Sequence, residues 1–204
     1  TLATTYCVGA TPATLPTTSN NSITGAWSPA NISTATAGTI TYTFTPDAGQ
    51  CATTATLVVT VSDNVLPTFT LATTYCVGAT PATLPSTSNN SITGAWTPAT
   101  ISTATAGSTV YTFTPTAGQC ATTTTMTITV NPNITPSFDA IGPICQNTPA
   151  PLLPGTSLNG ITGTWSPSII ITTTAGTVTY TFTPDAGQCA TTATMDVFVV
   201  NSDF

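Results

Sequence analysis

The chain has 204 residues and contains no lysine, arginine, histidine or glutamate. Its net charge of −6 at pH 7 comes from six aspartates, namely Asp47, Asp63, Asp139, Asp185, Asp196 and Asp203. Without imidazole, ammonium or guanidinium groups, the chain lacks the usual general bases, Schiff-base amines and phosphate-binding cations. Binding to nucleic acids or to anionic membrane surfaces needs the same cations, so we expect neither.

The apolar residues make up 40% of the chain, and they alternate with threonine instead of forming the long runs that cross a membrane. Threonine alone accounts for 55 residues, with valine, isoleucine, tyrosine and phenylalanine beside it. β-branched and aromatic residues favour strands, and a disordered chain would be poor in both. The composition therefore predicts an all-β protein.

The sequence repeats every 69 residues. The marker residues are two cysteines and one tryptophan in each repeat: Cys7, Cys76 and Cys145; Cys51, Cys120 and Cys189; Trp27, Trp96 and Trp165. Repeats one and two are identical at 53 of 69 positions. We predict three tandem domains, at 1–69, 70–138 and 139–204, and no enzyme, because no repeat holds a distinct set of reactive side chains.

The first half of each repeat has weak strand signals. In repeat one they fall at 2–6, 12–16, 22–27 and 32–36. The second half is clearer, because residues 39–45 alternate strictly, with Ile40, Tyr42 and Phe44 on one face.

A Pro-Asp-Ala-Gly-Gln turn at 46–50 leads into a second strand over 51–61, with Leu57, Val59 and Val61 facing inward. The same hairpin recurs at 108–130 and 177–199, where Asp196 should face outward. Six or seven short strands per repeat favour a small Ig-like two-sheet sandwich. The alternative is a β-solenoid, but its rungs would be shorter than 69 residues.

The repeats meet at stretches rich in asparagine and proline, 62–69 and 131–138. Pro67 and Pro136 cannot continue a central strand and restrict these linkers to extended conformations, so we expect semi-rigid spacers. We interpret the chain as a segment of a longer array.

Each repeat contains two cysteines 44 residues apart. A domain of this size buries little surface, so a disulfide is expected in an oxidising compartment. The simplest pairing lies within repeats: Cys7–Cys51, Cys76–Cys120 and Cys145–Cys189. The alternative pairs neighbouring repeats through cysteines 25 apart, Cys51–Cys76 and Cys120–Cys145. Metal binding and cysteine catalysis are not expected, since there is no histidine or other base.

The aspartates could be either structural residues or calcium ligands. Asp47 and Asp185 occupy the same turn position, which is Thr116 in repeat two, so we interpret them as turn residues instead of calcium ligands. Asp63 near the linker matches Pro132, which argues against a boundary calcium site. We expect no metal site and no cofactor.

Trp27, Trp96 and Trp165 are expected to fill the core of each domain instead of stacking on sugars. The outward threonine rows resemble ice-binding ladders, although threonine is also an ordinary residue on solvent-facing strands. Four Asn-x-Ser/Thr sequons begin at Asn20, Asn31, Asn89 and Asn133.

A family resemblance is carried by two stretches of repeat three: Ile-Thr-Gly-Thr-Trp-Ser-Pro at 161–167 and Tyr-Thr-Phe-Thr-Pro-Asp-Ala-Gly-Gln-Cys-Ala-Thr-Thr-Ala-Thr-Met at 180–195. They resemble the Ig-like tandem repeats of large Bacteroidetes cell-surface proteins, including gliding-motility-associated adhesins exported by type IX secretion. The resemblance extends over all three repeats. It implies an extracellular stalk, adhesin or filament, and it implies no catalytic residues.

The leading functional hypothesis is therefore a structural segment of a surface adhesin, whose partners are neighbouring repeats of the same longer chain and other copies in a fibre. The first alternative is a glycan-binding module that uses Tyr6 and Tyr75, although repeat three has Ile144 at that position. The second is a spacer in a secreted enzyme whose catalytic domain lies elsewhere. Strand edges with few charges are also poorly protected against pairing, which predicts lateral or end-to-end assembly.

Overall fold

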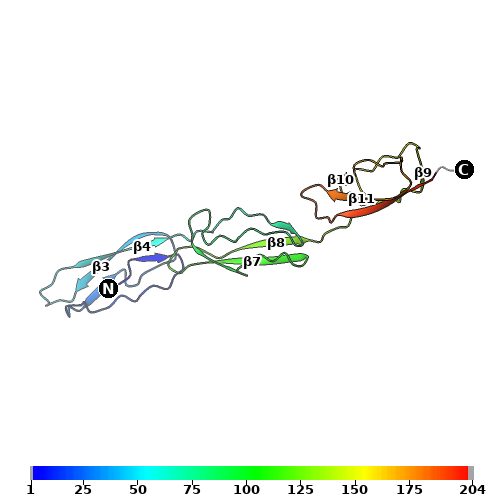
Figure 1. Ribbon diagram of the computed structural model, residues 1–204. Helices are drawn as coiled ribbons and strands as arrows, with labels where there is room; N and C mark the ends of the chain where they lie inside the picture. Colours follow the sequence, from blue (N-terminus) through cyan, green and yellow to red (C-terminus); the bar gives the residue numbers. More distant parts are fainter. Residues whose placement is uncertain (1, 202–204) are drawn as a thin grey trace. The chain divides into compact units, whose positions relative to one another are not determined.

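The computed structural model describes residues 2–201, and within them every regular element is a β-strand (Figure 1). Each repeat contributes one four-stranded sheet. Repeat one has β1 (Thr5–Cys7), β2 (Gly25–Ser28), β3 (Gly38–Pro46) and β4 (Ala55–Ser62). Repeat two has β5 (Thr74–Cys76), β6 (Gly94–Thr97), β7 (Gly107–Pro115) and β8 (Thr124–Asn131). Repeat three has β9 (Ile144–Cys145), β10 (Gly163–Ser166), β11 (Gly176–Pro184) and β12 (Ala193–Val200). The all-β prediction is confirmed, and no helix able to cross a membrane occurs in residues 2–201.

The strands of each sheet follow one order, β1-β4-β3-β2 in repeat one and its equivalents in the other two. The first strand is parallel to the last, so Cys7 lies beside Ser62, at the carboxyl end of β4. The equivalent Cys76 lies beside Asn131. The first cysteine of every repeat is thereby placed at the end of the sheet where the last strand leaves the repeat.

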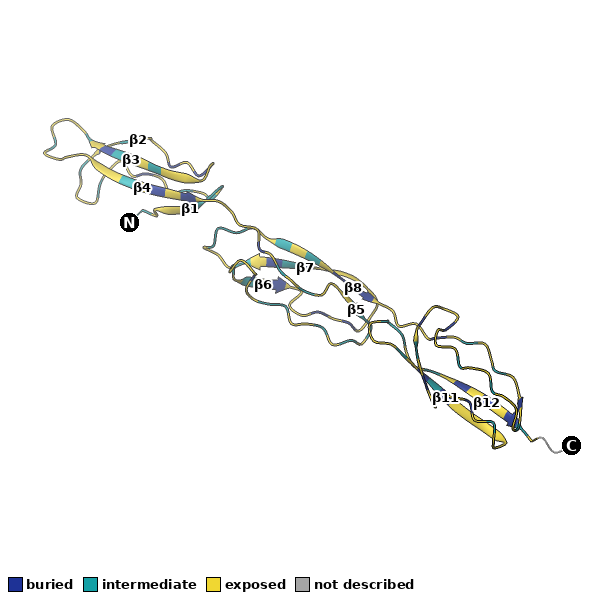
Figure 2. Ribbon diagram, turned by 90° about the horizontal axis from the view of Figure 1, so that it is seen from above, coloured by how far each residue is buried: buried dark blue, intermediate teal, exposed yellow. Residues whose placement is uncertain are grey.

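The predicted hairpins are confirmed. In repeat one β3 and β4 are antiparallel, with Tyr42 opposite Leu57 and Ile40 opposite Val59. Tyr42 and Val59 are each 1% exposed, whereas Val58 is 49% exposed. Buried and exposed residues alternate along these strands and along β12 (Figure 2). Asp196 in β12 is exposed to solvent, as expected. Period-two alternation therefore correctly identified the inner face of the sheet.

The first half of each repeat contains fewer strands than expected. Residues 2–6 and 22–27 correspond to β1 and β2, but the strands predicted at 12–16 and 32–36 are absent. Two prolines, Pro12 and Pro16, remove backbone donors from the first of these segments. Both segments nevertheless reach the core, because Leu15 is 7% and Ile32 is 6% exposed. The strand prediction is therefore wrong for these two segments, although each contributes one side chain to the core.

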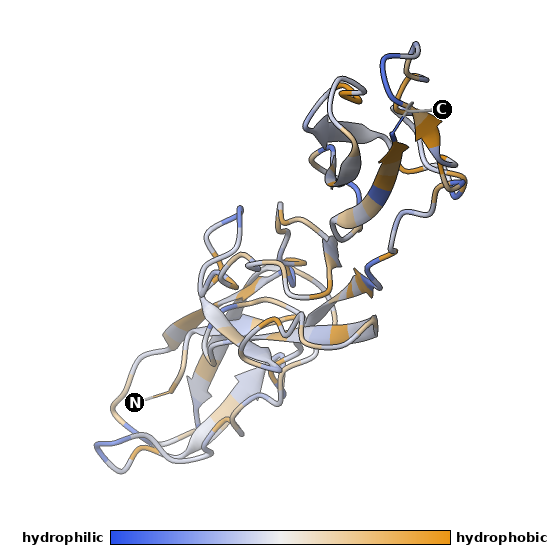
Figure 3. Ribbon diagram, turned by 45° about the vertical axis from the view of Figure 1, so that its right-hand side comes forward, coloured by the Kyte–Doolittle hydropathy of each residue, from blue (hydrophilic) through white to orange (hydrophobic). Residues whose placement is uncertain are grey.

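The chain folds into two compact units. The first comprises Thr1–Leu71, Thr83–Thr100 and Val110–Met126, and the second comprises Ala72–Ala82, Ile101–Thr109 and Thr127–Phe204. One core in the first unit surrounds Tyr42, and one in the second surrounds Tyr180 and Phe182. Much of the backbone is pale on the hydropathy scale, with apolar residues as separate bands (Figure 3), as expected where threonine alternates with core residues. The junction of repeats one and two lies within the first unit, and that of repeats two and three within the second.

Candidate functional site: the repeat junctions

Two disulfides join neighbouring repeats. Cys7 bonds to Cys120 and Cys76 bonds to Cys189, each across 113 residues, with Cα–Cα distances of 5.1 and 5.2 Å. Each bond therefore connects the first cysteine of one repeat to the second cysteine of the next. Cys51 and Cys145 carry free, exposed thiols.

The predicted pairing within repeats is wrong, and so is the alternative pairing across 25 residues. The reason is the parallel placement of β1 beside β4, which puts Cys7 level with Ser62. Cys51 precedes the opposite end of β4, whose eight residues span about 23 Å at about 3.3 Å per residue. A disulfide needs Cα atoms within about 7 Å, so Cys7 cannot reach Cys51.

The linker between repeats one and two is bound to repeat two as a short parallel β-bridge. The Val65 N–H donates to the Cys120 carbonyl at 2.8 Å, and the Val65 carbonyl accepts from the Thr122 N–H at 3.0 Å. At the next junction the Ile134 N–H donates to the Cys189 carbonyl at 2.8 Å and the Ile134 carbonyl accepts from Thr191 at 3.0 Å. Pro67 and Pro136 are buried. The linkers are thus docked parts of the following repeat, which corrects the expectation of spacers.

An asparagine side chain in repeat two binds the next part of the linker backbone. The Asn90 Nδ2 donates to the Leu66 carbonyl at 2.9 Å, and its Oδ1 accepts from the Thr68 N–H at 3.2 Å. Ser88 Oγ orients this amide by donating to Oδ1 at 2.6 Å while accepting from the Ile92 N–H. The side-chain amide thus donates to a backbone carbonyl and accepts from a backbone N–H, which are the two bonds that a paired strand would make with the linker.

The same arrangement recurs in repeat three. The Asn159 Nδ2 donates to the Thr135 carbonyl at 2.9 Å, and its Oδ1 accepts from the Ser137 N–H at 3.2 Å. Ser157 Oγ donates to Asn159 Oδ1 at 2.7 Å. Two copies of one set of contacts, 69 residues apart, indicate a defined recognition site for the linker.

An aromatic side chain completes each junction. The Phe69 ring lies 4.7 Å, centroid to centroid, from both Trp96 and Phe113. The Phe138 ring lies 4.7 Å from both Trp165 and Phe182. Edge-to-face and tilted arrangements at these distances are favourable for aromatic rings. The last residue of each linker is therefore packed into the core of the following repeat.

The tryptophans only partly follow the prediction. Trp96 and Trp165 are 6% and 7% exposed and belong to the core as expected. Trp27 is only half-buried, and among the described residues its ring stacks on Phe44 alone, at 5.2 Å. Each indole N–H donates to a proline carbonyl, that of Pro16, Pro85 or Pro154. The largest fully buried side chains are instead tyrosines of β3 and β11, Tyr42 and Tyr180.

The aspartates of the hairpin turns have structural partners. Asp47 Oδ2 accepts from Thr24 Oγ1 at 2.6 Å, and Asp185 Oδ2 accepts from Thr162 Oγ1 at 2.7 Å. These bonds tie the turn to the start of β2 or β10. Asp63 is exposed. Within residues 2–201 no three metal-ligating side chains come together, and Asp203 lies outside the described residues.

The tyrosines considered for glycan binding are engaged in the fold. The Tyr6 hydroxyl accepts from the Ala13 N–H and the Tyr75 hydroxyl from the Ala82 N–H, both at 3.2 Å. Both rings are half-buried, and the equivalent Ile144 is 9% exposed. The sequon side chains Asn89 and Asn133 donate to Thr70 Oγ1 and the Val77 carbonyl.

Sequence analysis missed the residues that make the junctions. A serine, an asparagine two residues later and a linker phenylalanine recur without change, as Ser88, Asn90 and Phe69 at one junction and Ser157, Asn159 and Phe138 at the other. These residues recur although some of their neighbours differ between repeats, such as Asn89 and its equivalent Leu158, and this recurrence could have identified them from the sequence. The recurrence could not reveal that the phenylalanine of one repeat packs in the next repeat, because a sequence period shows which positions are equivalent and not which repeats are in contact.

Comparison with known protein families finds no matching family model, and comparison with curated proteins finds no match.

Proposed function

We propose that the chain is a structural segment of an extracellular surface adhesin, stalk or filament, built from tandem Ig-like β-sandwich repeats that are covalently joined to one another. Its partners are the neighbouring repeats of the same longer chain and other copies in a fibre. It is not an enzyme and needs no cofactor.

One observation carries the proposal: the disulfides connect repeats, and both do so across 113 residues. A bond within a repeat would stabilise one repeat, whereas a bond such as Cys7–Cys120 carries load past residues 8–119, which belong to two neighbouring repeats. The linker docks at the same junction, so neighbouring repeats share both a covalent and a packed connection. Such a connection suits a protein that has to transmit tension.

The sandwich architecture is supported by the segments that cover each sheet. Leu15 and Ile32 come from extended segments outside the strands and pack against the core of β3 and β4. Thr34 Oγ1 donates to the Ala10 carbonyl at 2.7 Å and links the two segments. A second layer of extended backbone is what an Ig-like sandwich needs.

The location is supported by chemistry. Disulfides persist in oxidising compartments and are rare in the cytosol. The resemblance of all three repeats to Bacteroidetes surface repeats points to the same place. A surface rich in threonine with very few titratable groups also keeps its charge over a wide range of pH.

Single-molecule pulling on the ends of the chain tests the mechanical role. The shortest covalent path from residue 1 to residue 204 runs through both disulfides, so the oxidised chain should extend to roughly 240 Å. After reduction the fully unfolded chain should reach roughly 700 Å. The variant Cys51→Ser is the matched control and should not change either length. An oxidised chain that unravels to the reduced length would exclude a load-bearing role for these bonds.

Surface display is tested separately by labelling intact producing cells with an antibody raised against the chain. We expect labelling without permeabilisation, and electron microscopy should show it along projections. Labelling that requires permeabilisation would contradict an extracellular location.

A further inference from the structure

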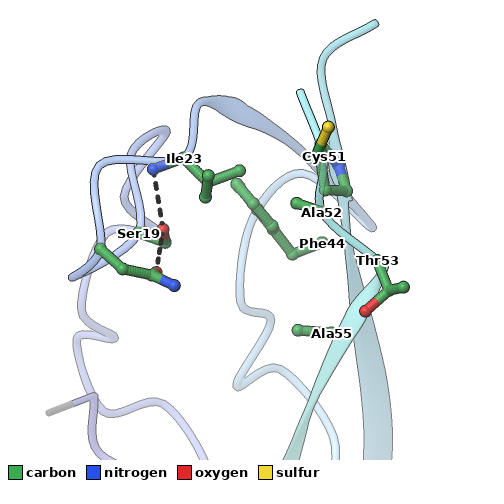
Figure 4. A pocket seen from close by; sticks show the side chains of 9 residues that line it. Ser19, Ile23, Phe44, Cys51, Ala52, Thr53 and Ala55 are labelled. Atoms are coloured by element: carbon green, nitrogen blue, oxygen red, sulfur yellow. Dashed lines mark hydrogen bonds between the residues drawn. The ribbon is translucent and has the colours of Figure 1, made fainter. Parts of the chain in front are cut away.

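Repeat one has an open groove in the place where repeats two and three hold a linker. A hollow of about 460 Å³ is lined by the loop that carries Ser19, Asn21 and Ile23 and by the segment that carries Cys51 and Ala52, and the Phe44 side chain lies between the two (Figure 4). A second hollow of about 320 Å³ shares the lining residue Ser19 with the first and is also lined by Asn20, Trp27 and Pro16.

These lining residues are the equivalents of the residues that bind the linkers. Adding 69 to each number converts Ser19, Asn21 and Cys51 into Ser88, Asn90 and Cys120. Ser88 orients Asn90, Asn90 binds the Leu66 carbonyl, and Cys120 binds the Val65 N–H and is bonded to Cys7. Adding 138 gives Ser157, Asn159 and Cys189, which do the same for residues 134–138 and Cys76. All three repeats therefore carry the same serine, asparagine and cysteine, and in repeats two and three these residues bind the linker of the preceding repeat.

The polar groups of the open groove are already arranged for a ligand. Ser19 Oγ accepts from the Ile23 N–H at 3.1 Å and donates to Asn21 Oδ1 at 2.7 Å, as the serines of the two filled grooves do. The Asn21 amide is therefore held in the orientation of Asn90 and Asn159. Within residues 2–201 its Nδ2 donates to no partner, whereas in the filled grooves that group binds a linker carbonyl.

Residues of the open groove are more exposed than their equivalents in the filled grooves, as expected where no linker covers them. Ser19 is half-buried, whereas Ser88 and Ser157 are 6% and 5% exposed. Trp27 is likewise half-buried, and Cys51 is exposed where Cys120 and Cys189 are half-buried and bonded. The backbone edge at Cys51 and Ala52 is the edge to which Val65 and Ile134 bind in the other repeats.

We infer that the groove of repeat one is a binding site for the linker of a preceding repeat in the same longer chain, a segment of the form Val/Ile-x-Pro-Thr/Ser-Phe. The Val or Ile forms a β-bridge to Ala52, the Asn21 amide binds the following carbonyl and N–H, and the Phe packs between Trp27 and Phe44. This is recognition by addition of a short strand, with a pocket for one side chain.

The same inference assigns partners to the two free thiols. Cys51 forms a disulfide with the first cysteine of the preceding repeat, and Cys145 with the second cysteine of the following repeat, in the pattern of Cys7–Cys120. Two thiols lose two protons and two electrons, which a small-molecule disulfide accepts as it is reduced to two thiols. Each repeat in the interior of the array then carries two bonds, one to each neighbour.

This inference extends the proposed function and rests on it only for the premise that the repeats belong to a longer tandem array. The test uses the complete chain and a synthetic peptide with the sequence of residues 63–70, Asp-Asn-Val-Leu-Pro-Thr-Phe-Thr. We expect saturable binding that protects Trp27, the most exposed of the three tryptophans, from quenching by acrylamide. A Trp27→Phe chain should lose most of this signal.

Matched variants locate the site. Asn21→Ala should weaken binding about tenfold, because two hydrogen bonds to the peptide backbone are lost. Asn31→Thr, which has the residue that repeat two carries at Thr100 and lies outside the groove, should leave binding unchanged. A peptide carrying Phe69→Ala should bind at least tenfold more weakly. Absence of saturable binding, or binding indifferent to Asn21→Ala and to Phe69→Ala, would overturn the inference.

The covalent part is tested on native material by alkylation, pepsin digestion and non-reducing mass spectrometry. We expect the peptide that contains Cys51 to be crosslinked to a cysteine of a preceding repeat. Recovery of Cys51 as an alkylated free thiol, or crosslinked to an unrelated protein, would overturn this part. Neither failure would alter the Cys7–Cys120 bond on which the proposed function rests, whereas failure of the pulling experiment would leave peptide binding unaffected.

Discussion

The linker-binding grooves of repeats one and two contain the same types of residue, but only the groove of repeat two holds a linker. At the entrance of repeat two, Asn90 binds the linker backbone, Phe69 packs on Trp96, and Cys120 is bonded to Cys7. In repeat one, Ser19 holds the equivalent Asn21 in the same way, and the equivalent Trp27 and Cys51 are more exposed than Trp96 and Cys120. The comparison shows that the serine–asparagine contact is the same whether or not a linker lies beside it.

Removal of the junction disulfide should produce the largest difference between the two entrances. The double variant Cys7→Ser/Cys120→Ser loses a bond that closes more than a hundred residues, worth about 4.7 kcal/mol in the chain-entropy model. The control is Cys51→Ser/Cys145→Ser in the 204-residue chain by itself, where both of these thiols are free. Denaturation by guanidinium measures both. Equal loss of unfolding free energy in the two variants would contradict the observed pairing.

Removal of the linker aromatic should have the next largest effect. Phe69→Ala leaves a cavity beside Trp96 and Phe113, and we expect a loss of about 2–3 kcal/mol, less than for a fully buried ring. Acrylamide should then quench a second tryptophan as readily as Trp27. Phe198→Ala, at a site that is 47% exposed, serves as the control and should change the stability by less than about 1 kcal/mol. An unchanged quenching profile would show that the linker ring does not shield Trp96.

The paired asparagines give the sharpest comparison. Asn90→Ala removes two hydrogen bonds to the linker and should cost about 1–2 kcal/mol. Asn21→Ala removes only the contact with Ser19 and should cost less than about 0.5 kcal/mol. Thermal unfolding of the two variants measures the difference. Similar losses at both positions would mean that the asparagine stabilises its own loop and not the junction.

The turn aspartates should have the smallest effect. Asp47→Ala removes a solvent-exposed hydrogen bond from Thr24 and should cost about 0.5 kcal/mol. Thr116→Ala, at the same position of repeat two, should be neutral. Chemical denaturation distinguishes the two outcomes, and a loss of several kcal/mol at Asp47 would indicate a role that the exposed bond does not explain.

Much of the fold could be predicted from local pattern alone. Alternation identified Tyr42, Val59 and Val61 as inward-facing and Asp196 as outward-facing, since a strand places successive side chains on opposite faces whatever surrounds it. The segments around Leu15 and Ile32 were predicted to be strands, but both are irregular extended backbone that still buries these two side chains. The junction asparagines were not recognised, because their partners lie more than twenty residues away in a segment interpreted as a spacer.

By itself, the sequence determined the all-β class, the 69-residue period, the hairpin of each repeat and the lack of basic side chains, because these depend on composition and on the order of neighbouring residues. Only the tertiary structure decided which cysteines meet and where the linkers lie. The deciding feature is the parallel pairing of β1 with β4, which sends Cys7 to the far end of its sheet and toward the next repeat. Strand order is a long-range property, and a 44-residue spacing between cysteines contains no information about it.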